Sequence, residues 1–140
     1  MKAAAREQRR TEIMDVAVRL LAEKGYRDTN MLDVAKSAGA SKETLYHWFG
    51  DKRGLYEAII RRNAETVQVV LEQSLDKAES TERTLRNFGA ALLRLLTGDD
   101  AVAINRAAVS EARADPQLAM TLAAAGRDAT LPPFVAFLEQ

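Results

Sequence analysis

Two short helices joined by a tight turn, within residues 29–52, constrain the fold of this chain more than any other part of the sequence. The first helix has apolar residues at the i, i+3, i+4, i+7 spacing of one helix face: Met31, Val34, Ala35 and Ala38. Asn30 precedes them as a capping residue, and Gly39 can take the left-handed conformation that ends a helix. Ser41 is then a good N-cap for a second helix. The sequence therefore predicts a helix-turn-helix in this segment.

The second helix, residues 42–49, is short and can bury only a few side chains. Leu45, Phe49 and part of Trp48 can face inward, so at least one of Tyr46 and Trp48 must be exposed. The outer face carries the remaining side chains: Lys42, Glu43, Thr44, Tyr46 and His47. Two helices joined by a short Gly-containing turn, with hydrogen-bonding groups on the second, form the arrangement that places a recognition helix in the DNA major groove.

A further helix is expected after Gly50, with Asp51 as its N-cap and Lys52 in its first turn. The free backbone N–H groups at a helix start bind phosphate well, and Lys52 would add positive charge there. The alternative is that Lys52 is simply a solvated surface residue.

A larger set of spaced residues matches one known pattern together: Gly25, Tyr26, Thr29, Val34, Ala35, Ala38, Gly39, Ala40, Ser41, Thr44, Leu45, Tyr46, Phe49, Lys52 and Leu55. This set resembles the DNA-binding domain of TetR/AcrR-type bacterial transcriptional regulators. The resemblance implies a homodimeric repressor that binds a palindromic operator in double-stranded DNA and is released by a small apolar inducer. With the exposed face described above, it gives the predicted DNA-binding residues: Asn30, Ser41, Lys42, Glu43, Thr44, Tyr46, His47, Trp48 and Lys52.

The rest of the sequence predicts helices throughout, and so an all-α fold. Residues 11–24 are expected to form a supporting helix that ends at Gly25. The basic residues 1–10 could extend it, contact the DNA backbone as a loose arm, or be disordered. From Asp51 the apolar spacing continues to Leu75 and predicts one long connecting helix.

The C-terminal half predicts a bundle of shorter helices. Their expected bounds are Ser80 or Thr81 to Gly98, Ala101 to Arg113 after an Asp99-Asp100 cap, and Asp115-Pro116 to Gly126. The expected inward residues are Leu85, Phe88, Leu92, Leu95 and Leu96 in the first, and Val102, Asn105, Ala108, Val109 and Ala112 in the second. The spaced residues Arg106, Glu111, Ala112, Pro116 and Leu118 are similar to the C-terminal domain in one branch of the same family. We therefore expect a DNA-binding domain over residues 1–50, and the connecting helix with a ligand-binding and dimerisation domain over residues 51–140.

Candidate ligand-binding residues lie in this second half. Phe88, Leu92, Leu95 and Val109 could line a cavity or simply fill a core, and the sequence does not separate the two. Asn105 on an otherwise apolar face could contact a ligand, but a structural hydrogen bond is the favoured interpretation.

Composition narrows the class of protein. A chain of 140 residues with 47% hydrophobic residues can bury a real core, and it favours one unit with sub-domains. It has no Cys, and no apolar run approaches the roughly 18 residues of a membrane span, so we expect a cytoplasmic protein. Residues 1–62 carry 13 Lys and Arg against 9 Asp and Glu, which suits a polyanion partner but equally suits a solvated surface.

Catalysis has no support in the sequence. His47 is the only His, so neither a His cluster for a metal nor a Ser-His-Asp arrangement away from the recognition helix is available. We predict no catalytic residues, metal or cofactor. Two rival functions remain: a helical adaptor that uses the helix-turn-helix for protein contacts, and an enzyme on a helical bundle.

The C-terminal residues carry one more expectation. A segment that opens with Leu131, Pro132 and Pro133 has Phe134, Val135, Phe137 and Leu138 as apolar residues, and the given chain stops at Gln140. Such a short helix is marginal unless it packs on something. We expect the 140 residues to be part of a longer regulator, to self-associate weakly and to form their homodimer only in the complete protein.

Overall fold

The computed structural model describes residues 2–140; of the predicted basic lead-in, Met1 lies outside the described residues. The elements in chain order are α1 (Lys2–Lys24), α2 (Met31–Ala38), α3 (Lys42–Phe49), α4 (Lys52–Asp76), α5 (Thr81–Thr97), α6 (Asp99–Glu111), α7 (Gln117–Leu122), the π-helix η1 (Ala123–Asp128) and α8 (Ala129–Leu138). No strand occurs in residues 2–140, so the predicted all-α fold is confirmed.

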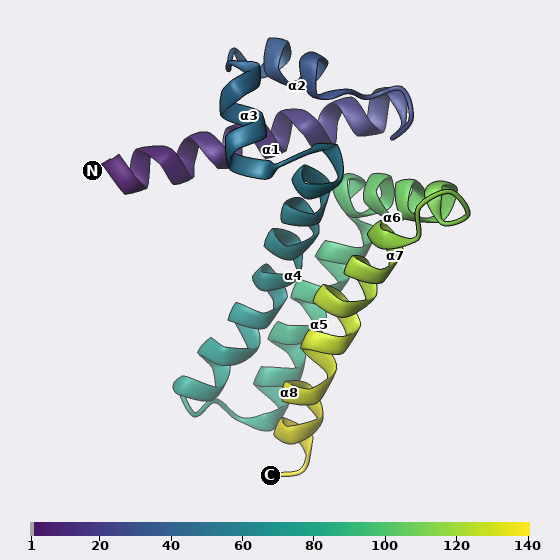
Figure 1. The fold of residues 1–140 in the computed structure, drawn as a ribbon. Coiled ribbons are helices and arrows are strands. Elements are labelled where there is room, and N and C mark those ends of the chain that lie inside the picture. Colours follow the sequence, from purple (N-terminus) through teal and green to yellow (C-terminus); the bar gives the residue numbers. More distant parts are fainter. Residues whose placement is uncertain (1) are drawn as a thin grey trace.

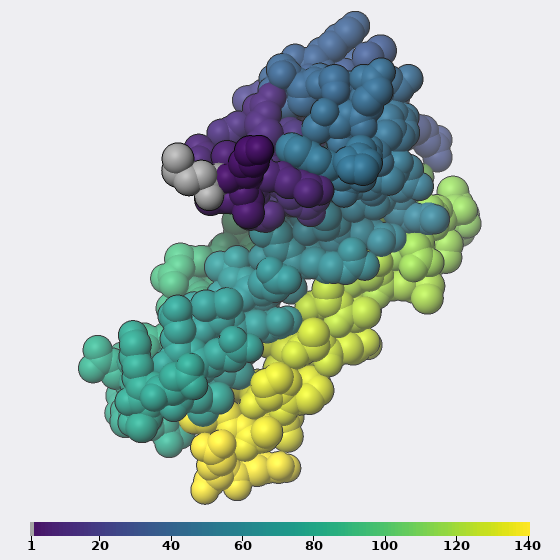
Figure 2. All heavy atoms as spheres, turned by 60° about the vertical axis from the view of Figure 1, so that its left-hand side comes forward, coloured from purple at the N-terminus to yellow at the C-terminus, as the bar shows by residue number. Residues whose placement is uncertain are grey.

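The first three helices form a unit at one end of the molecule. Figure 1 shows α2 and α3 lying on one side of α1, and α4 leaving this unit as the long connecting helix. Two glycines with positive φ lie where helices of this unit end: Gly25 follows α1 with φ +81°, and Gly50 separates α3 from α4 with φ +83°. Figure 2 shows the same division from another side, with α2 and α3 at one end and α8 at the other.

One hydrophobic core joins this N-terminal unit to the next helices. Ile13, Leu45 and Ile59 are fully buried members from α1, α3 and α4. Ile104 of α6 and Leu118 of α7 belong to the same cluster. The core therefore crosses the predicted boundary at residue 50, because α6 packs directly against α1.

A smaller cluster lies at the other end of α4. Val67 and Leu71 of α4 meet Phe88 of α5 and Phe137 of α8 there. Phe134 stacks on Phe88 with ring centroids 4.6 Å apart. The C-terminal helix thus packs on α4 and α5.

The bounds of α1 decide between the predicted alternatives, and those of α6 correct an expectation. Helix α1 begins at Lys2, so the basic lead-in extends the helix, the first of those alternatives. Asp99 and Asp100 lie in the first turn of α6, whose N-cap is Gly98 without a side-chain hydrogen bond.

The predicted inward face of α6 is also wrong in most of its members. The buried side chains are Ala101, Ile104, Ala107 and Ala108. Val102 and Val109 are exposed, Val109 at 78%. Both sets have helical spacing, and the alanine-rich face is the one buried because small side chains allow α1 and α6 to approach closely. On α5, Leu85 and Leu96 are likewise exposed, whereas Phe88 is buried.

Gly126 does not end a helix, contrary to expectation. It lies inside the π-helix, and helical structure continues from α7 to Leu138. A glycine costs a helix only about 1 kcal/mol relative to alanine, and packing on α4 offsets this. One contact to that helix is the hydrogen bond from Gln68 Nε2 to the carbonyl of Ala125, 3.3 Å.

Candidate DNA-binding interface

The two helices of the predicted helix-turn-helix are fixed by hydrogen bonds of their own caps. Asn30 Oδ1 accepts the backbone N–H of Asp33 at 2.9 Å, and Ser41 Oγ accepts that of Thr44 at 3.1 Å. Between them Gly39 takes φ +63° and ψ 35°, the left-handed conformation, and its N–H points back to carbonyls of α2. The predicted caps and the predicted glycine turn are confirmed.

Helix α3 has one buried and one exposed face. Leu45 and Phe49 are buried at 0% and 8% exposure, and Trp48 is half-buried. The exposed side chains are Lys42, Glu43, Tyr46 and His47, with Thr44 half-buried beside them. Tyr46 is 43% exposed, which confirms that the short helix cannot bury all of its aromatic residues.

Some of these polar groups already have partners within the chain. Ser41 Oγ and Thr44 Oγ1 lie 2.8 Å apart and share a hydrogen bond. The ammonium group of Lys42 lies 5.7 Å from the ring centroid of Tyr46. His47 and Glu43, by contrast, project from the exposed face without a hydrogen bond to the rest of residues 2–140.

Lys52 turns toward the corner between α1 and α2. Its ammonium group donates to the carbonyl of Tyr26 at 2.5 Å and to that of Thr29 at 2.9 Å. It also lies 4.1 Å from the ring centroid of Tyr26. Since an ammonium group has three N–H donors, these two carbonyls leave one N–H of Lys52 unused.

Burial shifts the pKa values around this corner. Desolvation lowers the pKa of Lys52, although Glu111 and Asp28 oppose the shift. Desolvation, followed by the charges of Asp115 and Asp51, raises the pKa of the Tyr26 hydroxyl to about 12. The Tyr26 hydroxyl therefore keeps its proton at neutral pH.

Two further contacts hold the corner to α1 and α4. The buried Thr29 hydroxyl donates to the carbonyl of Gly25 at 2.8 Å, and the Tyr56 hydroxyl donates to that of Ala17 at 2.9 Å. The rings of Tyr26 and Tyr56 meet edge to face, 5.4 Å between centroids. The start of α4 is therefore fixed relative to α1.

Sequence reasoning missed two residues that contact the ends of α2 and α3, Arg9 and Arg10 of α1. Arg9 Nη2 donates to the carbonyls of Ala38 at 2.6 Å and Gly39 at 2.9 Å. Arg10 Nη1 donates to the carbonyl of Trp48 at 3.3 Å. The partners are separated by 29 to 38 positions, so no local pattern indicates them.

Ion pairs connect the N-terminal unit to the helices behind it. Arg53 at the start of α4 pairs with Asp115 in the α6–α7 connection at 3.0 Å. A hydrogen bond from the backbone N–H of Gln117, and then Arg53 itself, lowers the pKa of Asp115. Arg62 of α4 pairs with Asp15 of α1 at 2.9 Å.

Three of the five candidate ligand residues lie together. Phe88, Leu92 and Leu95 line an almost wholly apolar cavity of about 350 Å³ between α4, α5 and α8. Asn105 lines an adjoining cavity of about 180 Å³, and its amide donates to the carbonyl of Ala101 at 2.8 Å. Val109 is not part of either cavity.

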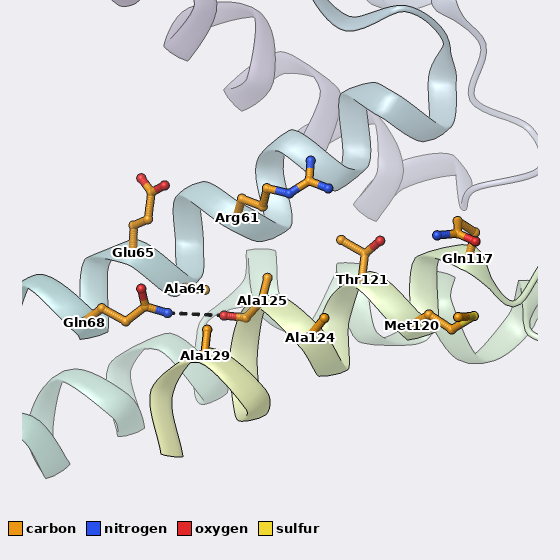
Figure 3. A pocket seen from close by; sticks show the side chains of 10 residues that line it. All are labelled: Arg61, Ala64, Glu65, Gln68, Gln117, Met120, Thr121, Ala124, Ala125 and Ala129. Carbon is orange, nitrogen blue, oxygen red and sulfur yellow. Dashed lines mark hydrogen bonds between the residues drawn. The ribbon is translucent and has the colours of Figure 1, made fainter. Parts of the chain in front are cut away.

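A larger, more open crevice lies on another side of α4. Figure 3 shows Arg61, Glu65 and Gln68 of α4 along one wall, and Gln117, Met120 and Thr121 of α7 along the other. Its volume is about 550 Å³.

Residues 2–140 hold no group of three or more His, Cys, Asp or Glu side chains placed to bind a metal ion. None of their helices combines the length and hydropathy needed to cross a membrane.

Two family profiles match the chain. Residues 13–59 match "Bacterial regulatory proteins, tetR family", the segment that contains α2 and α3. Residues 83–140 match "AefR-like transcriptional repressor, C-terminal domain". Together they cover both halves of the molecule.

Relatives and solved structures agree with these profiles. The HTH-type transcriptional repressor KstR2 of Rhodococcus jostii is 43% identical over 53 residues, which cover 38% of this chain and 26% of KstR2. A crystal structure of a putative TetR-family transcriptional regulator from Mesorhizobium loti is 25% identical, with a TM-score of 0.75 over 95% of this chain and 67% of that one. The structure of the flavonoid-responsive regulator FrrA is 28% identical, with a TM-score of 0.71 and the same coverage.

The sequence matches and the similar solved structures indicate the same family of regulators. The chain spans less than half the length of the curated relatives it matches. Its two halves nevertheless match the DNA-binding and the C-terminal profile in the expected order. This chain belongs to the TetR family of bacterial regulatory proteins.

Proposed function

We propose that this chain is a sequence-specific transcriptional regulator that lays α3 in the major groove of DNA. The observation that carries the proposal is the two-sided character of α3. Its apolar side is locked into the core by Leu45 and Phe49, and its other side exposes Lys42, Tyr46 and His47. A helix fixed in this way presents the same side chains to base edges each time it binds.

The proposed contacts divide by chemistry. Lys42, Glu43, Thr44, Tyr46 and His47 are the candidates for base edges, because they lie on the outer face of α3. The candidates for the phosphate backbone lie at helix ends nearby: Asn30, Ser41, Trp48 and Lys52. Lys52 would use the N–H that its two carbonyl partners leave over.

The second half, residues 51–140, is proposed to regulate this binding. The apolar cavity lined by Phe88, Leu92 and Leu95 suits a small apolar inducer. KstR2 is named a repressor and FrrA is named flavonoid-responsive, which supports repression relieved by a small molecule. The inducer would favour a spacing of two recognition helices that no longer matches successive major grooves, in a homodimer on a palindromic operator.

A helical adaptor is the alternative that shares the fold. It would use the exposed face of α3 for protein contacts, and it would show no preference for duplex DNA. We infer a non-enzymatic, cytoplasmic protein from the family, whose members are transcriptional regulators.

Duplex binding as a function of salt separates the two. The purified chain is titrated into a labelled random-sequence duplex at several salt concentrations, and anisotropy gives the affinity. A DNA-binding protein gives log K that falls linearly with log[salt], by about 0.9 for each phosphate contacted. An adaptor gives no binding at low salt, and that result would end the proposal.

A further inference from the structure

Arg9 joins α1 to the turn of the helix-turn-helix. One guanidinium nitrogen, Nη2, donates to the carbonyls of Ala38 and Gly39, and the other, Nη1, pairs with Glu12 at 2.9 Å. The last carbonyls of a helix have no partner inside the helix and carry partial negative charge. Arg9 therefore supplies the missing donors at the C-terminal end of α2.

Arg10 supplies a hydrogen-bond donor to the C-terminal end of α3. Nη1 donates to the carbonyl of Trp48, and the guanidinium lies 4.8 Å from the ring centroid of Phe49. Arg6, one turn earlier, lies 5.4 Å from the Trp48 ring centroid. The side chain of Arg10 is only 25% exposed, and it spans 38 positions of sequence to reach α3.

From these contacts we propose that Arg9 and Arg10 are positioning residues for DNA reading. They set the angles of α2 and α3 against α1, and they do not contact phosphate. Consecutive helical residues point about 100° apart, so one pair of neighbours can reach two different helices. The inference rests on the proposed function of α3. It adds that two arginines of α1, which contact no base in this proposal, fix the orientation in which α3 meets the base edges.

The alternative reading of two arginines beside a DNA-binding helix is a phosphate contact. The geometry favours positioning because three N–H groups of Arg9 are directed at Ala38, Gly39 and Glu12, and one of Arg10 is directed at Trp48. Arginine suits this role better than lysine, since its planar fork can serve two acceptors in fixed directions. A phosphate contact could use only the N–H groups of Arg9 that face neither these carbonyls nor Glu12, and the salt slope measures whether it forms.

The test compares Arg9→Met and Arg10→Met with Arg19→Met, which changes an exposed arginine of the same helix. Each variant is titrated into the duplex that the wild-type chain selects from a random pool, and into a random duplex of equal length, over a range of salt. Positioning predicts at least about tenfold weaker binding to the selected duplex, with unchanged affinity for the random duplex and an unchanged salt slope. Arg19→Met should leave the ratio of the two affinities unchanged.

Two results would overturn the proposal. A salt slope that falls by about 0.9 on both duplexes would mean that the arginine contacts phosphate. An unchanged affinity ratio together with a lower melting temperature would mean that its role is merely structural. If a Met variant does not fold, Arg9→Lys and Arg10→Lys replace it, because they keep the positive charge and remove the planar guanidinium. The same decrease in the ratio of affinities for the selected and the random duplex is expected.

A second readout does not depend on DNA. Trp48 is the only tryptophan in the chain, so its fluorescence reports on the end of α3. Arg10→Lys should shift its emission in the free protein, and Arg19→Met should not. An unshifted spectrum would contradict the Arg10 contact. If the wild-type chain selects no duplex at all, the proposed function fails, whereas the emission still tests the contact.

Discussion

Single side chains decide which face of α3 is available for recognition. Leu45 is completely buried and Phe49 nearly so, which leaves no other rotation of this short helix in the core. The exposure of His47 and Tyr46 is a consequence of this burial, because they lie on the opposite side of the same helical turns. Two buried apolar residues thus determine which side chains α3 exposes.

His47→Ala should change base preference at one position of the bound site. The imidazole is an exposed hydrogen-bonding group of α3, and loss of one base contact costs on the order of 1–3 kcal/mol. Affinities for the selected duplex and for its single-base variants measure the change. Gln73→Ala on the exposed side of α4 is the control. An equal loss on every duplex would show that His47 does not read a base.

The Tyr26 hydroxyl makes stability sensitive to alkaline pH. Its pKa is raised in the fold from 10.0 to about 12, chiefly by burial. The folded state therefore keeps a proton that the unfolded state loses, so the contribution is complete below pH 10 and is lost as pH rises toward 12. The lowered pKa of Lys52 has the opposite effect. Between that lowered value and 10.5 the unfolded state binds more protons than the folded state, so this contribution to stability rises with pH.

Urea unfolding at roughly pH 8, 10 and 11 tests this dependence, because the first value lies below the interval between the two tyrosine pKa values and the last lies inside it. Tyr26→Phe keeps the ring over Lys52 and should make the fall in unfolding free energy above pH 10 less steep. The remaining fall comes from Tyr56, because burial also raises the pKa of its hydroxyl. Tyr46→Phe, on the exposed ring of α3, should leave the curve of the wild-type chain unchanged. An equally steep fall in Tyr26→Phe would contradict the assignment.

At the scale of the helix, local sequence predicted the ends of α2 and α3 correctly. The caps Asn30 and Ser41 and the turn at Gly39 depend on neighbours within a few residues, and such signals can be seen in one sequence. The face of α6 could not be chosen in that way, because two faces have helical spacing and only contact with α1 selects between them. The carbonyl contacts of Arg9 and the exposure of Val109 depend on the same long-range packing.

Gly39→Ala should destabilise the chain by about 1–2 kcal/mol, the cost of a left-handed L-residue. The φ of +63° is the cause, since a Cβ at this position would meet nothing closer than Arg9 Nη2 at 3.9 Å. Gly89→Ala is the matched control: it lies within α5, and a Cβ there meets no atom within 4 Å. That change should stabilise the helix by about 0.5–1 kcal/mol. Thermal melts that move in the same direction for both variants would contradict this account.

In the whole molecule, α4 connects the N-terminal unit of α1, α2 and α3 to the apolar cavity. The core around Ile59 joins α1 and α3 to α6 and α7, and the Arg53–Asp115 ion pair links the start of α4 to the α6–α7 connection. The cavity of Phe88 and Leu92 lies further along the same helix. A ligand that moves α4 or its neighbours would therefore act on the base of the helix-turn-helix.

Leu92→Trp should block the apolar cavity. N-phenyl-1-naphthylamine, a neutral apolar fluorophore, should bind the wild-type chain with a saturable rise in fluorescence, because the cavity between α4, α5 and α8 is almost wholly apolar. The larger side chain should weaken this binding by at least about tenfold. Leu93→Trp places the same side chain at a position that is 63% exposed, and it should bind the probe like the wild-type chain. Equal binding of the probe by both variants would contradict the assignment of its site to this cavity.

Selection of bound duplexes from a random pool is the measurement that tests the central claim most directly. If α3 reads base edges, the recovered duplexes share a motif, and His47→Ala recovers a motif altered at one position in each half-site. A palindrome with half-sites about 34–36 Å apart would further indicate two copies bound with two-fold symmetry. Duplexes recovered without any common motif, although they bind the chain, would contradict the claim that this protein reads DNA sequence.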